Sequence, residues 1–324
     1  MEPRGPRAAP EPTDLPRKRT ARSDTPPRHE HFLGLGPAGF HRLHATSWGD
    51  PGNPRVVVCA HGYSGNGRDF DFLARELSRT HRVVCPDVAG RGESGWLGSA
   101  LEYNFPQFLT DMNTLLARLD VREVDWVGTS MGGLLGMLLA AQPNTPIRRL
   151  VMNDVGAFLP MPALQHISRN LEAPRSFKSL AAVEAHLRKT RREWGEISDA
   201  QWKELAIHGS RRVESGYAIH FDPAIARMVG PMPLAPGLFF WDAWQRVTCP
   251  VLLLRGAESD VFPRMVAESM LLRHPEVGLE EIPGCGHAPS LMNEAQAALV
   301  RGFLGAPVHW RDEDKLVAAA RAVV

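Results

Sequence analysis

Residues 125–140 read DWVGTSMGGLLGMLLA and place Ser130 between Gly128 and Gly132. The apolar residues before Ser130 are typical of a buried strand, and those after it predict a helix. A Gly-x-Ser-x-Gly pattern at a strand-to-helix turn marks a serine nucleophile, and an ordinary glycine-rich turn is the alternative. On so sharp a turn, side chains at the two glycine positions would collide with neighbouring elements. The turn also places the hydroxyl at the amino end of the helix, where free N–H groups favour negative charge.

Strands and helices alternate on both sides of this turn. The run RVVVCAHG is apolar on both faces, as expected of a central strand in a parallel sheet. Further strand-like runs lie at 82–87, 123–128, 148–154, 250–256 and 278–284. Helical spacing of apolar residues covers about 70–77, 105–119, 131–141, 263–273 and 290–304. This alternation predicts an α/β fold with a mainly parallel central sheet, helices on both faces, and ligands at the carboxyl ends of the strands.

The segment order predicts a core interrupted by a cap. Residues 31–156 and 247–305 carry the alternating pattern, which begins with two strands around a glycine-proline turn. Residues 157–246 hold helix-like segments without a clear parallel strand, which indicates a helical cap inserted before the penultimate strand. Residues 1–30 are rich in proline and charge and predict a disordered tail. Residues 306–324 form a C-terminal extension with a short expected helix around DKLVAAARAV.

Composition narrows the class of protein. The 324 residues are 44% apolar and 23% charged, as in a globular enzyme, and the net charge of +1 gives no reason to expect a nucleic-acid partner. No stretch is apolar enough to cross a membrane or to act as a secretory signal, so the cytoplasm is the default location. We expect neither metal nor cofactor, because the cysteines stand singly and are read as free thiols: Cys59, Cys85, Cys249 and Cys285.

A serine nucleophile needs a base, and the base needs an acidic partner. His287, in IPGCGHAPSL just beyond the last predicted strand, is the candidate base. His61 lies at the same sheet edge but is interpreted as a structural residue of the loop after the first parallel strand. Asp260 and Asp154 both follow strand segments at this edge, so position in the sequence leaves both open as the acid.

Five motifs in order resemble the α/β-hydrolase superfamily, in its capped, esterase-like serine hydrolase branch. They are HGYSGNGRDF, PDVAGRGES, GTSMGG, LLLRGAESD and GCGHAP, and the resemblance spans about residues 32–304. The chain order Ser, Asp, His agrees with that family. Its commonest arrangement takes the acid from the strand after the cap, which implies Asp260. Some members take it from the strand before the cap, which keeps Asp154 as the alternative.

The resemblance also assigns supporting residues. The oxyanion hole is expected to use the backbone N–H groups of Tyr63 and Met131. The segment Asp87–Ser94 resembles a family loop that turns sharply near the site, with structural glycines. Its Arg91 is expected either to contact a substrate or to form a scaffold ion pair.

The resulting expectation is acyl transfer to water, with a small, largely apolar carboxylic ester as substrate. Relatives that place an aspartate at the nucleophile position, the haloalkane dehalogenases and epoxide hydrolases, are excluded by Ser130. Lactones, thioesters and carbon–carbon bonds are alternative substrates for the same residues, and a non-catalytic ligand-binding protein is the rival from another class. The aromatic residues within 239–244 either line an acyl pocket or form cap core. The oligomeric state is left open.

Overall fold

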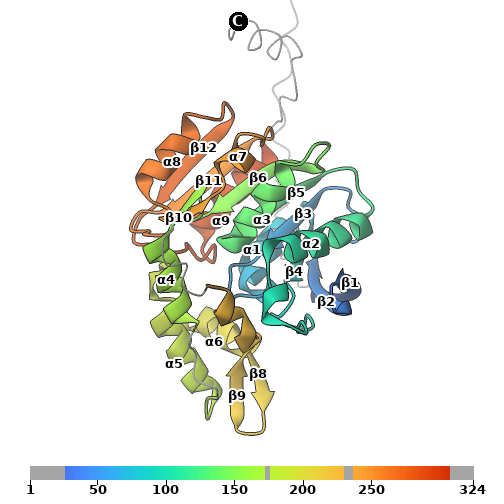
Figure 1. Ribbon diagram of the computed structural model, residues 1–324, viewed down its shortest axis with the longest axis vertical. Coiled ribbons are helices and arrows are strands. Elements are labelled where there is room, and N and C mark those ends of the chain that lie inside the picture. The colour runs from blue at the N-terminus through green and yellow to red at the C-terminus, as the bar shows by residue number, and fades with distance from the viewer. Residues whose placement is uncertain (1–25, 172–175, 230–235, 307–324) are drawn as a thin grey trace, which may run out of the picture.

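The computed structural model describes residues 26–171, 176–229 and 236–306, and its centre is an eight-stranded sheet (Figure 1). The strand order is β1-β2-β4-β3-β5-β6-β11-β12. Only the β1–β2 and β2–β4 pairs in this sheet are antiparallel. The bounds are β1 (Arg28–Gly36), β2 (Gly39–Trp48), β3 (Val56–Ala60), β4 (Arg82–Asp87), β5 (Val124–Thr129), β6 (Ile147–Asn153), β11 (Val251–Gly256) and β12 (Val277–Ile282). The predicted fold class, a mainly parallel α/β sheet, is confirmed.

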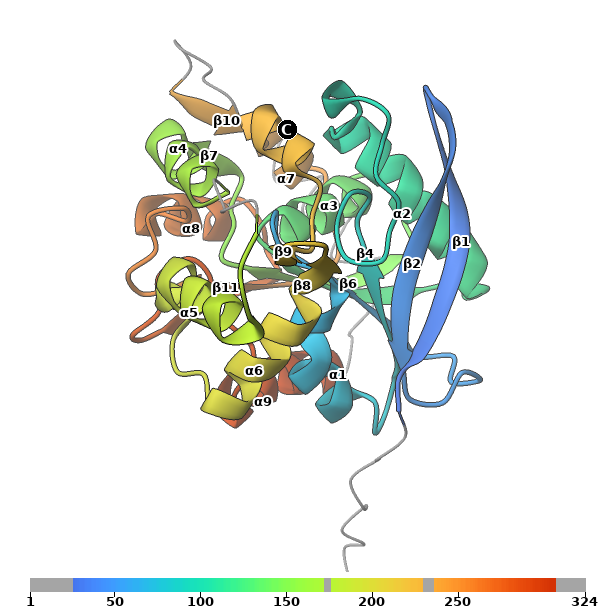
Figure 2. The ribbon, with the colours of Figure 1, turned by 90° about the horizontal axis from the view of Figure 1, so that it is seen from below.

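Strand β3 shows why the sheet is covered on both faces. Its residues are all buried, with Val56, Val58 and Ala60 packed into one apolar cluster and Val57 and Cys59 into another. Alternate side chains of a strand point to opposite faces, so each face needs its own layer of helices. One face is covered by α2 (Phe105–Leu119), α3 (Met131–Ala140), α7 (Trp241–Trp244) and α8 (Arg264–Leu271), and the other by α1 (Asp71–Leu77) and α9 (Glu294–Gly305) (Figure 2).

The cap is the segment between β6 and β11, and it lies over the carboxyl ends of the strands (Figure 1). Besides α7, which packs against the sheet, the described helices of this segment are α4 (Met161–Asn170), α5 (Leu180–Thr190) and α6 (Asp199–His208), with 3-10 turns at Arg192–Trp194 and Pro223–Val229. It also contains two antiparallel pairs that the sequence did not predict: β8 (Ser210–Val213) with β9 (Gly216–Ile219), and β7 (Phe158–Pro160) with β10 (Gly237–Phe239). Strands of three or four residues are too short to show a period-two pattern.

In the core, two element boundaries differ from those predicted by more than two residues. The first strand begins at Arg28, where it pairs with Ser47, so it overlaps the expected tail. The last helix begins at Glu294 and not at Ser290, because the Asn293 side chain caps it by accepting a hydrogen bond from the Gln296 N–H. The rest of the tail and the expected C-terminal helix lie outside the described residues. Two further 3-10 turns, Gly67–Phe70 and Ala100–Glu102, complete the core.

The four cysteines are buried and free, as predicted. Within the described ranges, no helix is long and apolar enough to span a membrane.

Candidate active site

Ser130 stands on the tight turn between β5 and α3. Its backbone has φ 52° and ψ −117°, a conformation that non-glycine residues rarely adopt. A β-carbon at Gly128 would collide with the carbonyl oxygen of Gly132, and one at Gly132 would collide with that of Ala60. The predicted need for glycine on both sides of the serine is therefore confirmed. The Ser130 N–H donates to the Asn153 carbonyl at 2.9 Å, which fixes the turn against β6.

A continuous chain of hydrogen bonds joins Ser130, His287 and Asp154. The Nε2 atom of His287 lies 3.0 Å from the Ser130 hydroxyl oxygen, and its Nδ1 atom lies 2.7 Å from Oδ2 of Asp154. The Asp154 side chain is fully buried, whereas that of His287 is partly exposed to the cavity. In this arrangement Nδ1–H donates to the carboxylate, which leaves Nε2 free to accept the serine proton. The sequence predicted the serine and the histidine in these places.

The carboxylate beside His287 belongs to Asp154 and not to Asp260, so the predicted position of Asp260 is wrong. Both ring nitrogens of His287 already have partners, and the Asp260 residue is exposed. The end of β11 and the loop after it support Asp154 instead: the Gly256 N–H donates to its Oδ1 at 2.8 Å, and the Ser259 hydroxyl donates to its Oδ2 at 2.6 Å. Because β6 and β11 are parallel neighbours, their carboxyl ends meet at one place, and sequence position cannot separate them.

Tyr63 and Met131, whose amides are expected to form the oxyanion hole, line the same cavity as Ser130. Met131 is the first residue of α3, and Tyr63 follows the end of β3. Among the hydrogen bonds between described residues, neither N–H group is used as a donor. The rest of Tyr63 is held in place, since its hydroxyl donates to the Ile225 carbonyl at 2.8 Å and its carbonyl accepts from Nε of Arg91 at 3.0 Å. Both amides therefore have no hydrogen-bond acceptor among the described residues, as donors kept for a ligand would.

His61 has the supporting position that the sequence predicted. It is fully buried, its Nε2 accepts from the Val88 N–H at 2.9 Å, and its Nδ1 lies 2.7 Å from the Gly62 carbonyl. Since Nε2 is an acceptor, Nδ1 carries the proton and donates to Gly62. Burial lowers the pKa of His61, which keeps it neutral. The imidazole thus joins the loop of Tyr63 to the loop after β4.

Arg91 is a scaffold residue, but its partners are not those predicted. It is completely buried and donates to the carbonyl groups of Tyr63 and Ala89. Its guanidinium also lies 4.9 Å from the centre of the Tyr63 ring and 5.0 Å from that of Phe108. Burial lowers the pKa of Arg91 to about 10. The expected ion pair is absent among the described residues, and Arg91 is not among the residues that line the cavity.

The glycines around Arg91 are structural, as expected. Gly90 and Gly92 have φ of +83° and +51°. A β-carbon at Gly92 would collide with the Asp87 carboxylate, which accepts hydrogen bonds from the amides of Gly67 and Glu93. The sharp turn of this loop therefore depends on glycine.

Sequence reasoning missed Asn153, which connects three parts of the site. Its side-chain amide donates to the Thr129 hydroxyl at 3.0 Å and to the Pro289 carbonyl at 2.8 Å. It thereby joins the ends of β5 and β6 to the loop that carries His287. The sequence did contain a sign of this role, because Asn153 is a polar residue at the end of an apolar strand and precedes Asp154.

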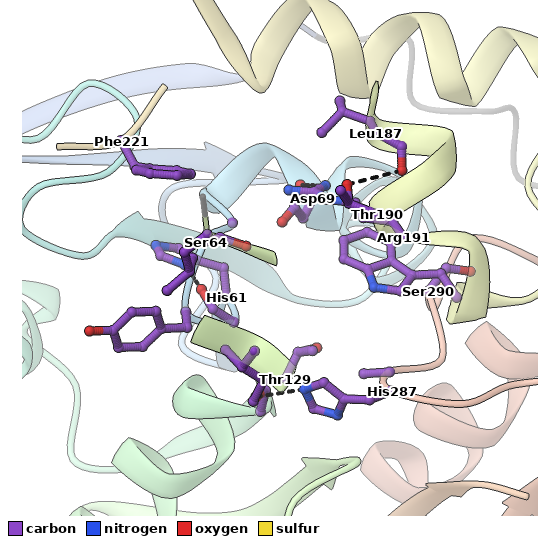
Figure 3. Close-up of a pocket in the computed structure, with 18 of the residues that line it drawn as sticks. His61, Ser64, Asp69, Thr129, Leu187, Thr190, Arg191, Phe221, His287 and Ser290 are labelled. Atoms are coloured by element: carbon purple, nitrogen blue, oxygen red, sulfur yellow. Dashed lines mark hydrogen bonds and ion pairs between the residues drawn. The ribbon is translucent and has the colours of Figure 1, made fainter. Parts of the chain in front are cut away.

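The cavity above Ser130 has two parts, which share Ser130, Tyr63 and Ile167. The apolar lobe, with a volume of about 240 Å³, is lined by residues that include Phe105, Met131, Leu134, Leu159, Leu164 and Leu238. The polar lobe, with a volume of about 120 Å³, is lined by residues that include Asp69, His186, Thr190, Arg191, Trp194 and His287 (Figure 3). His287 borders the polar lobe but not the apolar lobe.

The aromatic residues of 239–244 do not line either lobe. Phe239 is exposed and contacts Phe158, Phe240 packs edge-on against Phe105, and Trp244 is fully buried in the core. The acyl-pocket interpretation is therefore wrong for these rings, and the cap-core interpretation holds only in part, because Trp244 packs into the core beside the sheet and Phe239 is exposed. The aliphatic Leu238 beside them lines the apolar lobe.

No cluster of three or more histidine, cysteine or acidic side chains is placed to hold a metal ion in the parts of the chain that the structure describes.

Comparison with known proteins identifies the family. Residues 57–301 match the model of the alpha/beta hydrolase family, so the chain belongs to that family and is a hydrolase. It is 43% identical to a 3-hydroxybutyrate-oligomer hydrolase from Cupriavidus necator, over 86% of this chain and 97% of that protein. A putative hydrolase from Rickettsia typhi superposes with a TM-score of 0.81 at 26% identity, over 88% of this chain and all of that one. An alpha/beta hydrolase from Novosphingobium aromaticivorans superposes with a TM-score of 0.75 at 31% identity, over 86% of this chain and 98% of that one.

Proposed function

We propose that the protein is a serine ester hydrolase that works through an acyl-enzyme on Ser130. The observation that carries the proposal is the hydrogen-bond chain from Ser130 through His287 to Asp154. A serine in strained backbone geometry, with an oriented imidazole behind it, is the arrangement that activates a hydroxyl for attack.

The same groups act in both half-reactions, and His287 serves first as base and then as acid in each. His287 takes the proton of Ser130 as its oxygen attacks the ester carbonyl, and Asp154 stabilises the resulting imidazolium. The amides of Met131 and Tyr63 hold the oxyanion; the loss of one such donor typically costs about 2.7–4 kcal/mol. The imidazolium then gives its proton to the leaving alcohol, and water releases the acid by the same steps.

For the substrate, we propose short linear esters of hydroxy acids, such as oligomers of 3-hydroxybutyrate. The similarity to a 3-hydroxybutyrate-oligomer hydrolase extends over almost the whole of that relative. The cavity supports the same choice, because an apolar lobe and a polar lobe on the two sides of Ser130 suit an ester with a small alkyl-bearing acyl part and a more polar alcohol part.

The test combines active-site labelling with substrate comparison. A fluorophosphonate should label the protein stoichiometrically, Ser130→Ala should abolish labelling, and Ser64→Ala should retain it, because Ser64 lines the polar lobe without joining the hydrogen-bond chain. Hydrolysis of a 3-hydroxybutyrate dimer should exceed that of a lactone, a thioester and a β-diketone. A folded protein that is never labelled would support a ligand-binding role instead, and faster turnover of any other substrate would replace the proposed one.

A further inference from the structure

The polar lobe contains one buried cation whose hydrogen-bonding capacity is only partly used. Arg191 is 7% exposed, and its Nη1 donates to Oδ1 of Asp69 at 3.2 Å. Between described residues, no other side-chain donor of this guanidinium has an acceptor, and none of its nitrogens is buried without a partner. Since arginine has five N–H donors, several remain for a ligand in the cavity.

Arg191 and Asp69 are the only charged residues among the described ones that line this lobe. His186 also lines it, but burial, together with Arg191, lowers the pKa of His186, so the imidazole is neutral at neutral pH. The guanidinium is therefore the group that would attract an anion here. Figure 3 shows Asp69 and Arg191 beside each other, across the cavity from His287.

The position of Arg191 relative to His287 is fixed by the backbone. The Arg191 guanidinium stacks at 4.3 Å from the ring centre of Trp194. The carbonyl of Trp194 accepts from the Ser290 N–H at 3.1 Å, and that of Glu193 accepts from the Gly286 N–H at 2.8 Å. These bonds attach the turn that follows Arg191 to the loop that carries His287.

The polar lobe is also the side on which the leaving group departs. A general base that has taken the serine proton gives it to the leaving alcohol, so that alcohol must lie next to the imidazole. Of the two lobes, His287 borders only the polar one, whereas Met131, whose amide is the expected oxyanion donor, borders only the apolar one. The acyl part of the substrate therefore occupies the apolar lobe and the alcohol part occupies the polar lobe.

We propose that the polar lobe binds esters whose alcohol part carries a free carboxylate, and that Arg191 binds this carboxylate. The proposal rests on the proposed function and deepens it: an oligomer of a hydroxy acid ends in a carboxylate only on the alcohol side of its last ester bond. Attack by Ser130 then breaks the bond between the carbonyl carbon and the ester oxygen. His287 protonates that oxygen, and the free hydroxy acid leaves with its carboxylate on Arg191, so oligomers shorten from the carboxyl end.

The test compares two substrates that differ only in charge: the 3-hydroxybutyrate dimer with a free carboxylate and the same dimer ending in a carboxamide. The wild type should prefer the carboxylate. Arg191→Gln should lower kcat/KM for the carboxylate by about 100-fold and leave the carboxamide nearly unchanged, since a charged hydrogen-bonded pair is lost. Arg191→Lys should recover part of the rate, because it keeps the charge without the planar fork.

Two further variants separate ligand binding from a role in holding the cap. Asp69→Asn should raise kcat/KM for the carboxylate dimer, because it removes an anion beside the bound carboxylate. If the Arg191–Asp69 pair only joined the cap to the core, Asp69→Asn would instead cause the same loss as Arg191→Gln. Arg212→Gln is the matched control: Arg212 is an exposed cap arginine that borders neither lobe, so this change should alter the rate by less than about twofold.

Each result decides between the two proposals. Equal rates on carboxylate and carboxamide in the wild type, or an equal loss on both in Arg191→Gln, would overturn the role of Arg191 and leave the ester hydrolase intact. If neither dimer nor p-nitrophenyl butyrate is cleaved in a Ser130-dependent way, the proposed function itself is wrong. If Arg191→Gln fails to fold by circular dichroism, the wild-type preference and Arg191→Lys still decide the question.

Discussion

The core and the cap border the same cavity, but they contribute to it differently. The core places Ser130, His287 and Asp154 at the ends of strands, where each is fixed by hydrogen bonds of 3.0 Å or less. The cap lines the cavity with side chains on helices and turns, among them Leu164 and Arg191. The difference indicates that changes in the core should lower the rate for every ester, whereas changes in the cap should alter the choice between esters.

The largest effect is expected at the acid. Asp154→Asn should lower kcat by about 10⁴ on all esters, because an amide at this position favours the wrong tautomer of His287. Asp260→Asn, the matched control in the exposed loop, should change kcat by less than about twofold. Steady-state kinetics on p-nitrophenyl butyrate measures both. A greater loss of kcat in Asp260→Asn than in Asp154→Asn would mean that Asp260, after β11, is the acid.

A change at Leu164 tests whether the cap determines the choice between esters. Leu164→Trp should fill part of the apolar lobe and lower kcat/KM for hexanoyl esters by about 30-fold relative to acetyl esters, since each methylene in an apolar pocket is worth about 1–3 kcal/mol. The measurement is a series of p-nitrophenyl esters of increasing chain length. An equal loss on all chain lengths would mean that this part of the cap governs the chemical step.

Ser259 tests whether the core supports Asp154 as described. Ser259→Ala removes a hydroxyl that donates to the buried carboxylate at 2.6 Å, and it should lower kcat by about tenfold on every ester. Ser210→Ala is a suitable control, because the Ser210 hydroxyl is also buried and hydrogen-bonded, to the Ala206 carbonyl, but Ser210 lines neither lobe. A Ser259→Ala variant with unchanged kcat would show that Gly256 alone positions the acid.

The smallest effect is expected on the stability of the fold at low pH. The core and the cap should both lose stability there. Burial lowers the pKa of His61, His81 and His274 in the core and of His186 and His208 in the cap below the ordinary value of 6.5. Above pH 6.5 these histidines are neutral in both the folded and the unfolded chain. Below pH 6.5 they take up protons first in the unfolded chain, so the free energy of unfolding decreases as the pH falls. Each kcal/mol lost should lower Tm by about 2–4 °C.

Calorimetry at pH 7.5 and pH 5.5 checks this expectation. One transition should move to lower temperature at the lower pH. A Tm that stays constant or rises would mean that the buried histidines gain protons without cost, and two transitions that separate would mean that the cap and the core respond independently.

The sequence predicted those parts of the site that depend on local pattern. Ser130 and His287 each follow a strand and lie in a glycine-containing turn or loop, and the backbone constraints of these segments are visible in the residues themselves. The acid was mispredicted because Asp154 and Asp260 follow neighbouring parallel strands, and only the side-chain contacts of Ser259 and Gly256 distinguish them.

The cap was the least predictable part. Its paired strands have only three or four residues, which leaves no pattern to read. Arg191 had no signature either, because its position is defined by Asp69, which lies 122 residues earlier in the chain. Contacts between residues so distant in sequence become apparent only once the fold brings them together.

The backbone bonds from residues 193 and 194 to the histidine loop also bear on engineering. A chimera that received its cap from another family member would lose two carbonyl acceptors for the amides of Gly286 and Ser290, and the imidazole would shift even if every catalytic side chain were retained. Successful grafts should therefore keep residues 191–195 as part of the recipient and exchange only the segments on either side.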